Sequence, residues 1–191
     1  MLESLKKYVS GYVSLTQEEF TELSNRLLIR NYDNKAQLVG VGEVEYYLNF
    51  LVKGLARKYF VKGKEEIITQ IAREGEMISS SASFLSGSPS SYIVETIGPA
   101  TFLSISRQQL EALYVGHPVI ERLGRLVITH LFLQKEEWEH ECIRLDTKDR
   151  FLHFVRNNQD LMHRVPQKYL ASYLNMKPET FSRLKKKNYK L

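Results

Sequence analysis

Short β-forming segments at close spacing constrain the fold of this chain more than any other feature of its sequence. The predicted strands are residues 46–52, 55–61, 65–71, 92–95 and 100–105. The sequences Lys53-Gly54, Lys62-Gly63-Lys64 and Gly98-Pro99 separate neighbouring segments and are typical of turns. Many short strands with turns roughly every 8–12 residues predict a β-barrel or sandwich-like domain.

A serine-rich segment interrupts these strands. Residues 79–91 contain eight serines together with Gly87 and Pro89, which predicts a loop. Serine hydroxyls and backbone amides could cradle an anion there. An ordinary surface loop is the alternative interpretation.

Helical periodicity flanks the β segments on both sides. Thr16 followed by Glu19 is a capping-box pattern and predicts the start of a helix. Beyond Pro118, apolar residues recur at helical spacing over about three heptads, which predicts a helix of about 25 residues. Its apolar face exceeds what a small domain covers, so a dimer interface is favoured over packing on its own β-domain. The predicted interface residues are Ile120, Leu123, Val127, His130 and Leu131.

The positive charge is concentrated at the C-terminus. The whole chain has 27 basic and 22 acidic residues, a net charge of +5. Residues 151–191 carry nine basic and two acidic residues, a net +7, whereas residues 1–150 carry 18 and 20, a net −2. A short basic segment of this kind suggests a polyanionic partner, with a solvated basic tail as the alternative.

Two short helices joined by a tight turn are predicted within that basic segment. Pro166 and Pro178 suit the first turns of the helices, and Asn175-Met176-Lys177 suits the turn between them. This pattern predicts a helix-turn-helix over residues 167–187, whose second helix presents arginine or glutamate to base edges and lysines to phosphates. An ordinary helical hairpin is the alternative. The predicted DNA-binding residues are Lys168, Lys177, Glu179, Thr180, Ser182, Arg183, Lys186 and Lys187, and Lys190 also suits a phosphate.

Other classes of protein fit the sequence poorly. The single cysteine excludes a disulfide framework and a four-thiolate metal site within one chain. No apolar run reaches about 18 residues and the N-terminus lacks a secretion signal, so a cytoplasmic protein without a membrane partner is expected. All five histidines follow residue 116, which opposes a metal-dependent β-barrel enzyme or a Ser-His-Asp triad in the β-domain. We expect no catalytic residue, metal or cofactor.

Several motifs resemble those of the Crp/Fnr transcription regulators. Residues 47–57 resemble a family hairpin with a central glycine, Arg73-Glu74-Gly75-Glu76 resembles the turn before the phosphate-binding cassette, and Leu103–Ser106 resembles the strand that leads into the hinge helices. Residues 179–184 resemble the recognition-helix signature. The resemblance covers nearly the whole chain. It implies a homodimer that binds a duplex DNA operator of approximate two-fold symmetry, with RNA polymerase as a further partner that the family allows.

The resemblance also implies the domain organisation. The expected fold class is α+β. Residues 1–115 would form a double-stranded β-helix, a jelly-roll-like effector domain similar to cyclic-nucleotide-binding domains. Residues 116–146 would form the long dimerisation helix and hinge, and residues 147–191 a helical helix-turn-helix domain whose wing is truncated or absent.

The sequence departs from the cyclic-nucleotide-binding members of that family. Those members carry a glutamate that holds the ribose and an arginine that holds the cyclic phosphate. The corresponding positions here are residues 79–81 and Ser90, and neither charged group is present. We therefore expect no tight binding of cyclic AMP. If another small-molecule effector binds, the expected pocket residues are Ser80, Ser81, Ser90, Ser91 and Tyr92.

The runner-up hypothesis is a ligand-binding or protein-interaction module with a β-roll sensor and a C-terminus that does not bind DNA. The four cysteines with which the Fnr branch holds a cluster are also missing, since Cys142 is the single cysteine.

Overall fold

The computed structural model of this chain describes residues 1–188. They form two compact units. The first unit consists of Met1–Phe60 and Thr69–His130, and the second consists of Val61–Ile68 and the chain from Leu131 onward. Within the described residues, no helix combines the length and the apolar character needed to cross a bilayer.

The first unit opens with two short helices, α1 (Leu2–Ser10) and α2 (Gln17–Asn25). The predicted capping box at the start of α2 is confirmed. The Thr16 hydroxyl accepts a hydrogen bond from the Glu19 N–H (3.2 Å), and the Glu19 carboxylate accepts one from the Thr16 N–H (2.7 Å). The first backbone N–H groups of a helix have no intrahelical partner, and this exchange satisfies two of them, those of Thr16 and Glu19.

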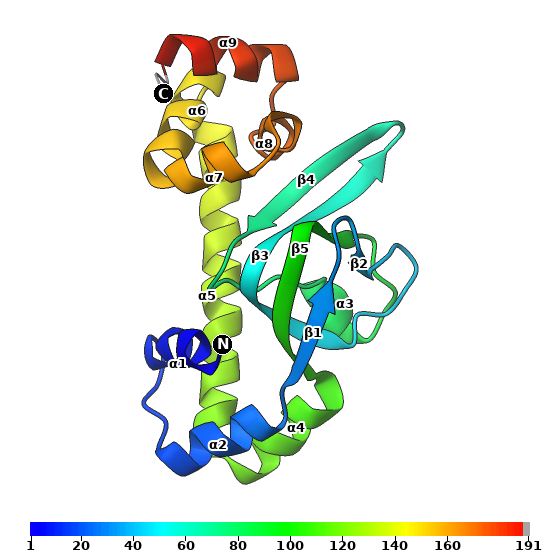
Figure 1. The fold of residues 1–191 in the computed structure, drawn as a ribbon, viewed down its shortest axis with the longest axis vertical. Helices are drawn as coiled ribbons and strands as arrows, with labels where there is room; N and C mark the ends of the chain where they lie inside the picture. The colour runs from blue at the N-terminus through cyan, green and yellow to red at the C-terminus, as the bar shows by residue number, and fades with distance from the viewer. Residues whose placement is uncertain (189–191) are drawn as a thin grey trace. The chain divides into compact units, whose positions relative to one another are not determined.

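An antiparallel sheet forms the centre of the first unit (Figure 1). The strands run in the order β1-β5-β3-β4, and β2 also pairs with β5. Val39, Leu51, Val94 and Phe102 are buried together in the core of this sheet. The bounds of the strands are β1 (Leu28–Tyr32), β2 (Gln37–Val39), β3 (Tyr47–Lys62), β4 (Glu65–Ala72) and β5 (Ile93–Ser106).

Two of the three predicted turns are wrong, because β3 and β5 each continue without reversing. The β3–β5 register shifts on both sides of Lys53, which makes the Lys53-Gly54 sequence a bulge. Gly54 adopts φ +98°, and a Cβ there would lie 2.5 Å from the Pro99 carbonyl oxygen. Glycine therefore lets the two strands approach closely at the bulge, where a turn had been expected. The predicted turn at Gly63 is confirmed between β3 and β4.

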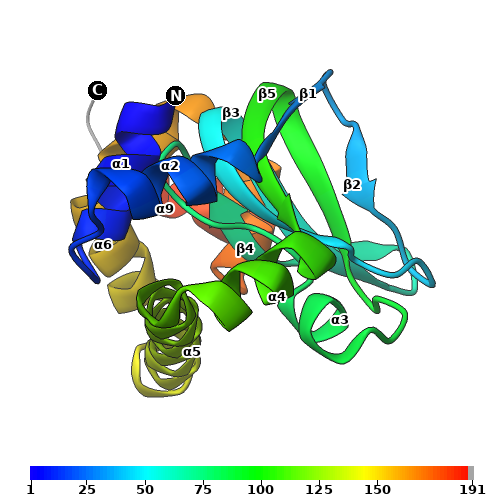
Figure 2. The ribbon, with the colours of Figure 1, turned by 90° about the horizontal axis from the view of Figure 1, so that it is seen from below.

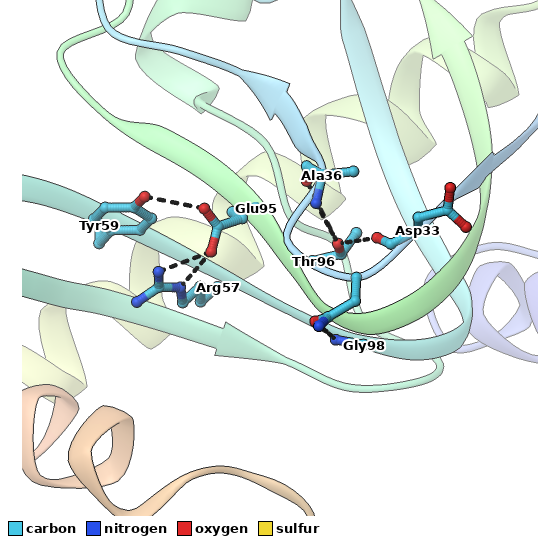
Figure 3. A network of polar contacts seen from close by, with 8 residues as sticks. Asp33, Ala36, Arg57, Tyr59, Glu95, Thr96 and Gly98 are labelled. Carbon is cyan, nitrogen blue, oxygen red and sulfur yellow. Dashed lines mark hydrogen bonds and ion pairs between the residues drawn. The ribbon is translucent and has the colours of Figure 1, made fainter.

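A buried ion pair links β3 to β5 in the interior of the sheet (Figure 3). Arg57 and Glu95 are register partners, and Arg57 Nη2 lies 2.7 Å from Glu95 Oε1. The Tyr59 hydroxyl donates to Glu95 Oε2 (3.2 Å), so both carboxylate oxygens accept hydrogen bonds. Buried charges are tolerated when they are paired and hydrogen-bonded in this way, and the pair holds the register of the two strands.

The connection between β1 and β2 is fastened to β5 by Thr96. The Thr96 hydroxyl donates to the Asp33 carbonyl (2.6 Å), and its oxygen accepts from the Ala36 N–H (3.0 Å; Figure 3). The Gly98 N–H donates to the Asn34 side chain (2.9 Å). Side chains therefore satisfy backbone groups that lie outside the sheet ladder.

One helix lies between β4 and β5, and two more follow β5 directly. α3 (Ser81–Ser86) lies within the segment predicted as a loop, so that prediction is only partly correct. α4 (Arg107–Gly116) continues from β5 and leads into α5 (Pro118–Arg144), as Figure 2 shows. The prediction of a long helix is confirmed, since α5 has 27 residues.

The second unit contains four further helices: α6 (Thr147–Asn157), α7 (Gln159–Arg164), α8 (Gln167–Tyr173) and α9 (Pro178–Asn188). Asp146 caps α6, because its carboxylate accepts hydrogen bonds from the N–H groups of Lys148 and Asp149 (2.8 Å each). Phe151 and Phe181 are fully buried and meet edge to face at 5.4 Å. The described residues end with α9, so the expected truncated or absent wing stays a prediction.

We predict that Gly54→Ala lowers the free energy of unfolding by about 2–4 kcal/mol, because alanine would combine a strained backbone with a clash against β5. Gly63→Ala is the matched control, since Gly63 also has positive φ but has open space around it. That variant should lose only about 1 kcal/mol. Urea unfolding of both variants measures the difference, and equal losses would contradict the bulge contact.

Candidate nucleic-acid interface

The helix-turn-helix predicted from the sequence is present as α8, a four-residue turn and α9. Phe181 and Leu184 of α9 are buried, so the helix turns one face inward. Glu179, Arg183 and Lys186 are exposed on other positions of the helix. The packing of two apolar side chains thus decides which polar side chains a partner could reach.

A groove of about 810 Å³ lies over the start of α8 and the exposed face of α9. It brings together five of the eight predicted DNA-binding residues. Two further residues of its lining, Gln167 and Pro178, were not among the predicted DNA-binding residues. Each is the first residue of a helix, and that position is the signal that could have identified them. The residues that line the groove are Gln167, Pro178, Glu179, Ser182, Arg183, Lys186 and Lys187.

The other predicted DNA-binding residues lie outside the lining of this groove. Lys168 is exposed, and its ammonium lies 5.0 Å from the centre of the Tyr169 ring. Lys177 is exposed in the turn just before α9, and Thr180 is half-buried. Lys190 lies outside the described residues.

Hydrogen bonds fix the turn between the two helices. Asn175 adopts φ +51°, a left-handed conformation that asparagine tolerates better than most residues. The Met176 N–H donates to the Ala171 carbonyl (3.0 Å). The Arg150 guanidinium of α6 donates to the Leu174 carbonyl (2.8 Å), so the turn is held from the side as well.

Aromatic stacking joins α8 to the C-terminal part of α5. The Trp138 and Tyr173 rings are parallel to within 3°, with centroids 4.5 Å apart. Phe154 of α6 meets the same tyrosine edge to face at 5.8 Å. Aromatic pairs of this geometry contribute about 0.5–1.5 kcal/mol beyond their buried area.

The tip of the β3–β4 hairpin belongs to this second unit and contacts α8. The Ser172 hydroxyl donates to the Glu66 carbonyl (2.7 Å) and accepts from the Ile68 N–H (3.0 Å). The Ser172 hydroxyl thus satisfies two backbone groups of the edge strand β4, the Glu66 C=O and the Ile68 N–H. The hairpin tip therefore braces the first helix of the helix-turn-helix.

The predicted dimer residues occupy different environments. Ile120, Leu123 and Val127 are buried within the first unit of a single chain. His130 is exposed and meets Tyr12 edge to face at 5.7 Å, and Leu131 is half-buried. The apolar side chains that α5 leaves exposed are instead Phe132 (57%), Leu133 (54%) and Ile143 (86%).

The serines of the expected effector pocket bond to their own chain. The Ser90 hydroxyl lies 2.7 Å from the Ser80 hydroxyl oxygen and 2.8 Å from the Tyr92 carbonyl, and both serines are buried. Ser81 and Tyr92 are half-buried, and Ser91 is exposed. The two buried hydroxyls would have to exchange these partners before they could bond to a ligand.

Two charged side chains border this serine segment and were missed by the sequence analysis. The Lys58 ammonium donates to the Ser79 carbonyl (3.5 Å) and lies 5.8 Å from the centre of the Tyr92 ring. Glu45 is 2% exposed, and its Oε1 accepts from the Tyr47 N–H (3.0 Å). Its Oε2 has no hydrogen-bond partner among residues 1–188. Lys58 lies on β3 and Glu45 just before it, and these positions alone gave no signal that the two side chains would meet the serines.

Three solved structures illustrate the likeness to known folds. The c-di-GMP responsive global regulator CLP, which links cell–cell signalling to virulence gene expression in Xanthomonas campestris, matches with a TM-score of 0.66 and 18% identity over 90% of this chain and 91% of that chain. FixK2 from Bradyrhizobium japonicum matches with a TM-score of 0.74 and 17% identity over 84% and 83%. A CooA mutant from Carboxydothermus hydrogenoformans matches with a TM-score of 0.64 and 15% identity over 86% and 77%.

The chain has the fold of these proteins. They are Crp/Fnr-family regulators with the cyclic-nucleotide-binding fold, so the expected α+β fold class is confirmed. No protein-family model matches the sequence, and no curated protein is significantly similar to it. At 15–18% identity this likeness establishes the fold.

Glu45 should make the stability of the folded chain depend on pH. Burial is the main cause that raises the pKa of its carboxyl above the ordinary value of 4.5. The unfolded chain therefore releases this proton at lower pH than the folded chain. The free energy of unfolding should accordingly fall as pH rises from 4.5 through the raised folded value.

We predict that Glu45→Gln removes this pH-dependent loss of stability, because glutamine does not ionise. The free energy of unfolding of the variant should therefore increase relative to that of the native chain as pH rises above 4.5. Glu111→Gln, at an exposed position of α4, controls for the loss of one negative charge. Urea unfolding of the three proteins between pH 4.5 and 7.5 measures the trend. A constant difference between Glu45→Gln and the native chain would contradict it.

Proposed function

We propose that this chain is a homodimeric transcription regulator that binds duplex DNA through α9. The observation that carries the proposal is the groove over α9, where exposed arginine, glutamate and lysine side chains gather on a helix-turn-helix. Among folds with this architecture, the neighbours CLP, FixK2 and CooA are regulators, which supports the same class of function.

The chemistry of the groove suits both parts of DNA recognition. Arg183 can donate two hydrogen bonds to the edge of a guanine, and Glu179 can accept one from a cytosine. These two residues are four positions apart on α9 and so project from the same side of the helix. Lys186 and Lys187, one turn further on, are placed to neutralise backbone phosphates.

We further propose that two copies pair along α5. Phe132, Leu133 and Ile143 are large apolar residues that α5 exposes, and pairing would remove them from water. For Ile120, Leu123, Val127, His130 and Leu131, the dimer role stays a prediction. A two-fold pair of helix-turn-helix units would place the two α9 helices in successive major grooves, about 34–36 Å apart.

We predict that substitutions in the groove separate sequence recognition from general affinity. A duplex selected from random sequences with the native chain provides the probe. Arg183→Ala and Glu179→Ala should each relax the preference at one base pair of each half-site, at a cost of about 1–3 kcal/mol. Lys186→Ala should weaken binding to all sequences and reduce the slope of affinity against salt by about one charge.

Lys7→Ala is the matched control, since Lys7 is exposed on α1 in the other unit. Fluorescence anisotropy at several salt concentrations measures all four variants. If the native chain fails to bind duplex DNA at low salt, the regulator proposal falls, and the ligand-binding or protein-interaction module becomes the better account.

We also predict that cyclic AMP does not bind tightly. Serines at residues 79–81 and at residue 90 stand where the ribose-binding glutamate and the phosphate-binding arginine would be. The ligand therefore loses charge-assisted hydrogen bonds worth on the order of 1.5–3 kcal/mol each. Ser80 and Ser90 also bond to each other, which a ligand would have to disrupt. Isothermal titration calorimetry should detect no micromolar binding. A micromolar or tighter dissociation constant would contradict the prediction.

A further inference from the structure

One arginine of α6 has a role that the sequence analysis did not anticipate. Arg150 is only 6% exposed, although its side chain carries a permanent charge. Its guanidinium compensates for burial by donating hydrogen bonds to backbone carbonyls. The acceptors are the carbonyls of Leu174 (from Nε, 2.8 Å), Leu145 (from Nη1, 3.0 Å), Cys142 (from Nη1, 3.2 Å) and Asn175 (from Nη2, 3.5 Å).

These acceptors belong to two separate parts of the second unit. Cys142 lies in the last turn of α5, where the carbonyls have no intrahelical partner, and Leu145 directly follows that helix. Leu174 and Asn175 lie in the turn immediately before α9. A single planar group therefore joins the end of the long helix to the start of the DNA-facing helix.

The hydrogen bonds of the Arg150 guanidinium are more directional than the aromatic contacts next to them. Trp138 and Tyr173 also connect α5 to α8, but stacked rings can slide over each other at little cost. The guanidinium is rigid and its N–H groups point in fixed directions. Hydrogen bonds weaken steeply when they are misaligned, so the carbonyls at its two sides are held at a fixed distance and angle.

We propose that Arg150 is a positioning residue that sets the direction of α9 relative to the C-terminal end of α5, and through it the spacing of half-sites that a dimer accepts. This inference rests on the proposed function, in which α5 pairs two copies and α9 binds DNA. Arg150 itself is buried and contacts no DNA in this account. Lysine cannot replace it, because one ammonium lacks the planar fork that spans both sets of carbonyls.

The experiment compares a duplex with two half-sites against a duplex with one. Both come from the sequence selected with the native chain, and two further duplexes have the spacer lengthened or shortened by one base pair. The full-length variants are Arg150→Met and Arg150→Lys. Arg156→Met is the control, because Arg156 is an exposed arginine on the same helix.

Arg150→Met and Arg150→Lys should lose about tenfold or more in affinity for the two-half-site duplex, which corresponds to ~1.4 kcal/mol. Their affinity for the single half-site should change by less than about threefold, because α9 itself is intact. They should also discriminate less between the three spacers. Arg156→Met should keep the native ratio between the two duplexes and the native spacer preference.

The folding of each variant can be checked in the same samples. Trp138 is the only tryptophan of the chain, and its stacking on Tyr173 makes its emission a reporter of the second unit. If Arg150→Met shows the emission of an unfolded unit, Arg150→Lys, which keeps the charge and three donors, decides the question.

Two results would overturn the inference. In the first, folded Arg150 variants lose affinity equally for one and two half-sites, which would assign Arg150 a structural role only. In the second, they bind both duplexes and all spacers as the native chain does. Failure of the native chain to bind any duplex is a different outcome, since it would overturn the proposed function as well.

Discussion

The hydrogen bonds of the buried Arg150 guanidinium are the constraint on which the candidate DNA interface depends. They connect the end of α5 to the turn that precedes α9. Without them, the carbonyl of the fully buried Leu174 would lose its hydrogen-bond donor, at a cost of about 1–3 kcal/mol. The inward packing of Phe181 and Leu184 turns the charged face of α9 outward. The groove that carries the functional proposal is a consequence of this arrangement.

In the β-domain, buried polar side chains are instead stabilised by hydrogen bonds to one another. The Arg57–Glu95 pair holds the register of β3 and β5, and Gly54 lets the two strands approach at a bulge. The buried serines follow the same rule, since Ser80 and Ser90 bond to each other. The serine segment thus differs from a binding site in which charged side chains already face the ligand. Lys58 nevertheless brings one ammonium group close to the segment.

The sequence predicted best the elements that local interactions decide. The capping box at Thr16, the length of α5 and the pair of short helices around Asn175 are local patterns, and the structure confirms them. The Lys53-Gly54 turn was wrong because glycine with positive φ suits a turn and a bulge equally. Only the pairing of β3 with β5, some 45 residues further along the chain, decides between them.

The candidate site could be predicted in part for the same reason. The helical repeat of α9 identified Glu179, Ser182, Arg183, Lys186 and Lys187, which the groove brings together. The repeat of α5 showed that Ile120, Leu123 and Val127 are buried, but a repeat cannot tell which surface covers them. Arg150 gave no signal at all, because two of its partners are 24 and 25 residues away in the chain.

Hydroxyl-radical footprinting of the native chain on its selected duplex tests the central claim most directly, because it asks whether two copies of α9 engage one operator. The account predicts two protected windows related by approximate two-fold symmetry, with centres about one helical turn of DNA, or 10–10.5 base pairs, apart. A single protected window, or uniform protection without symmetry, would contradict it.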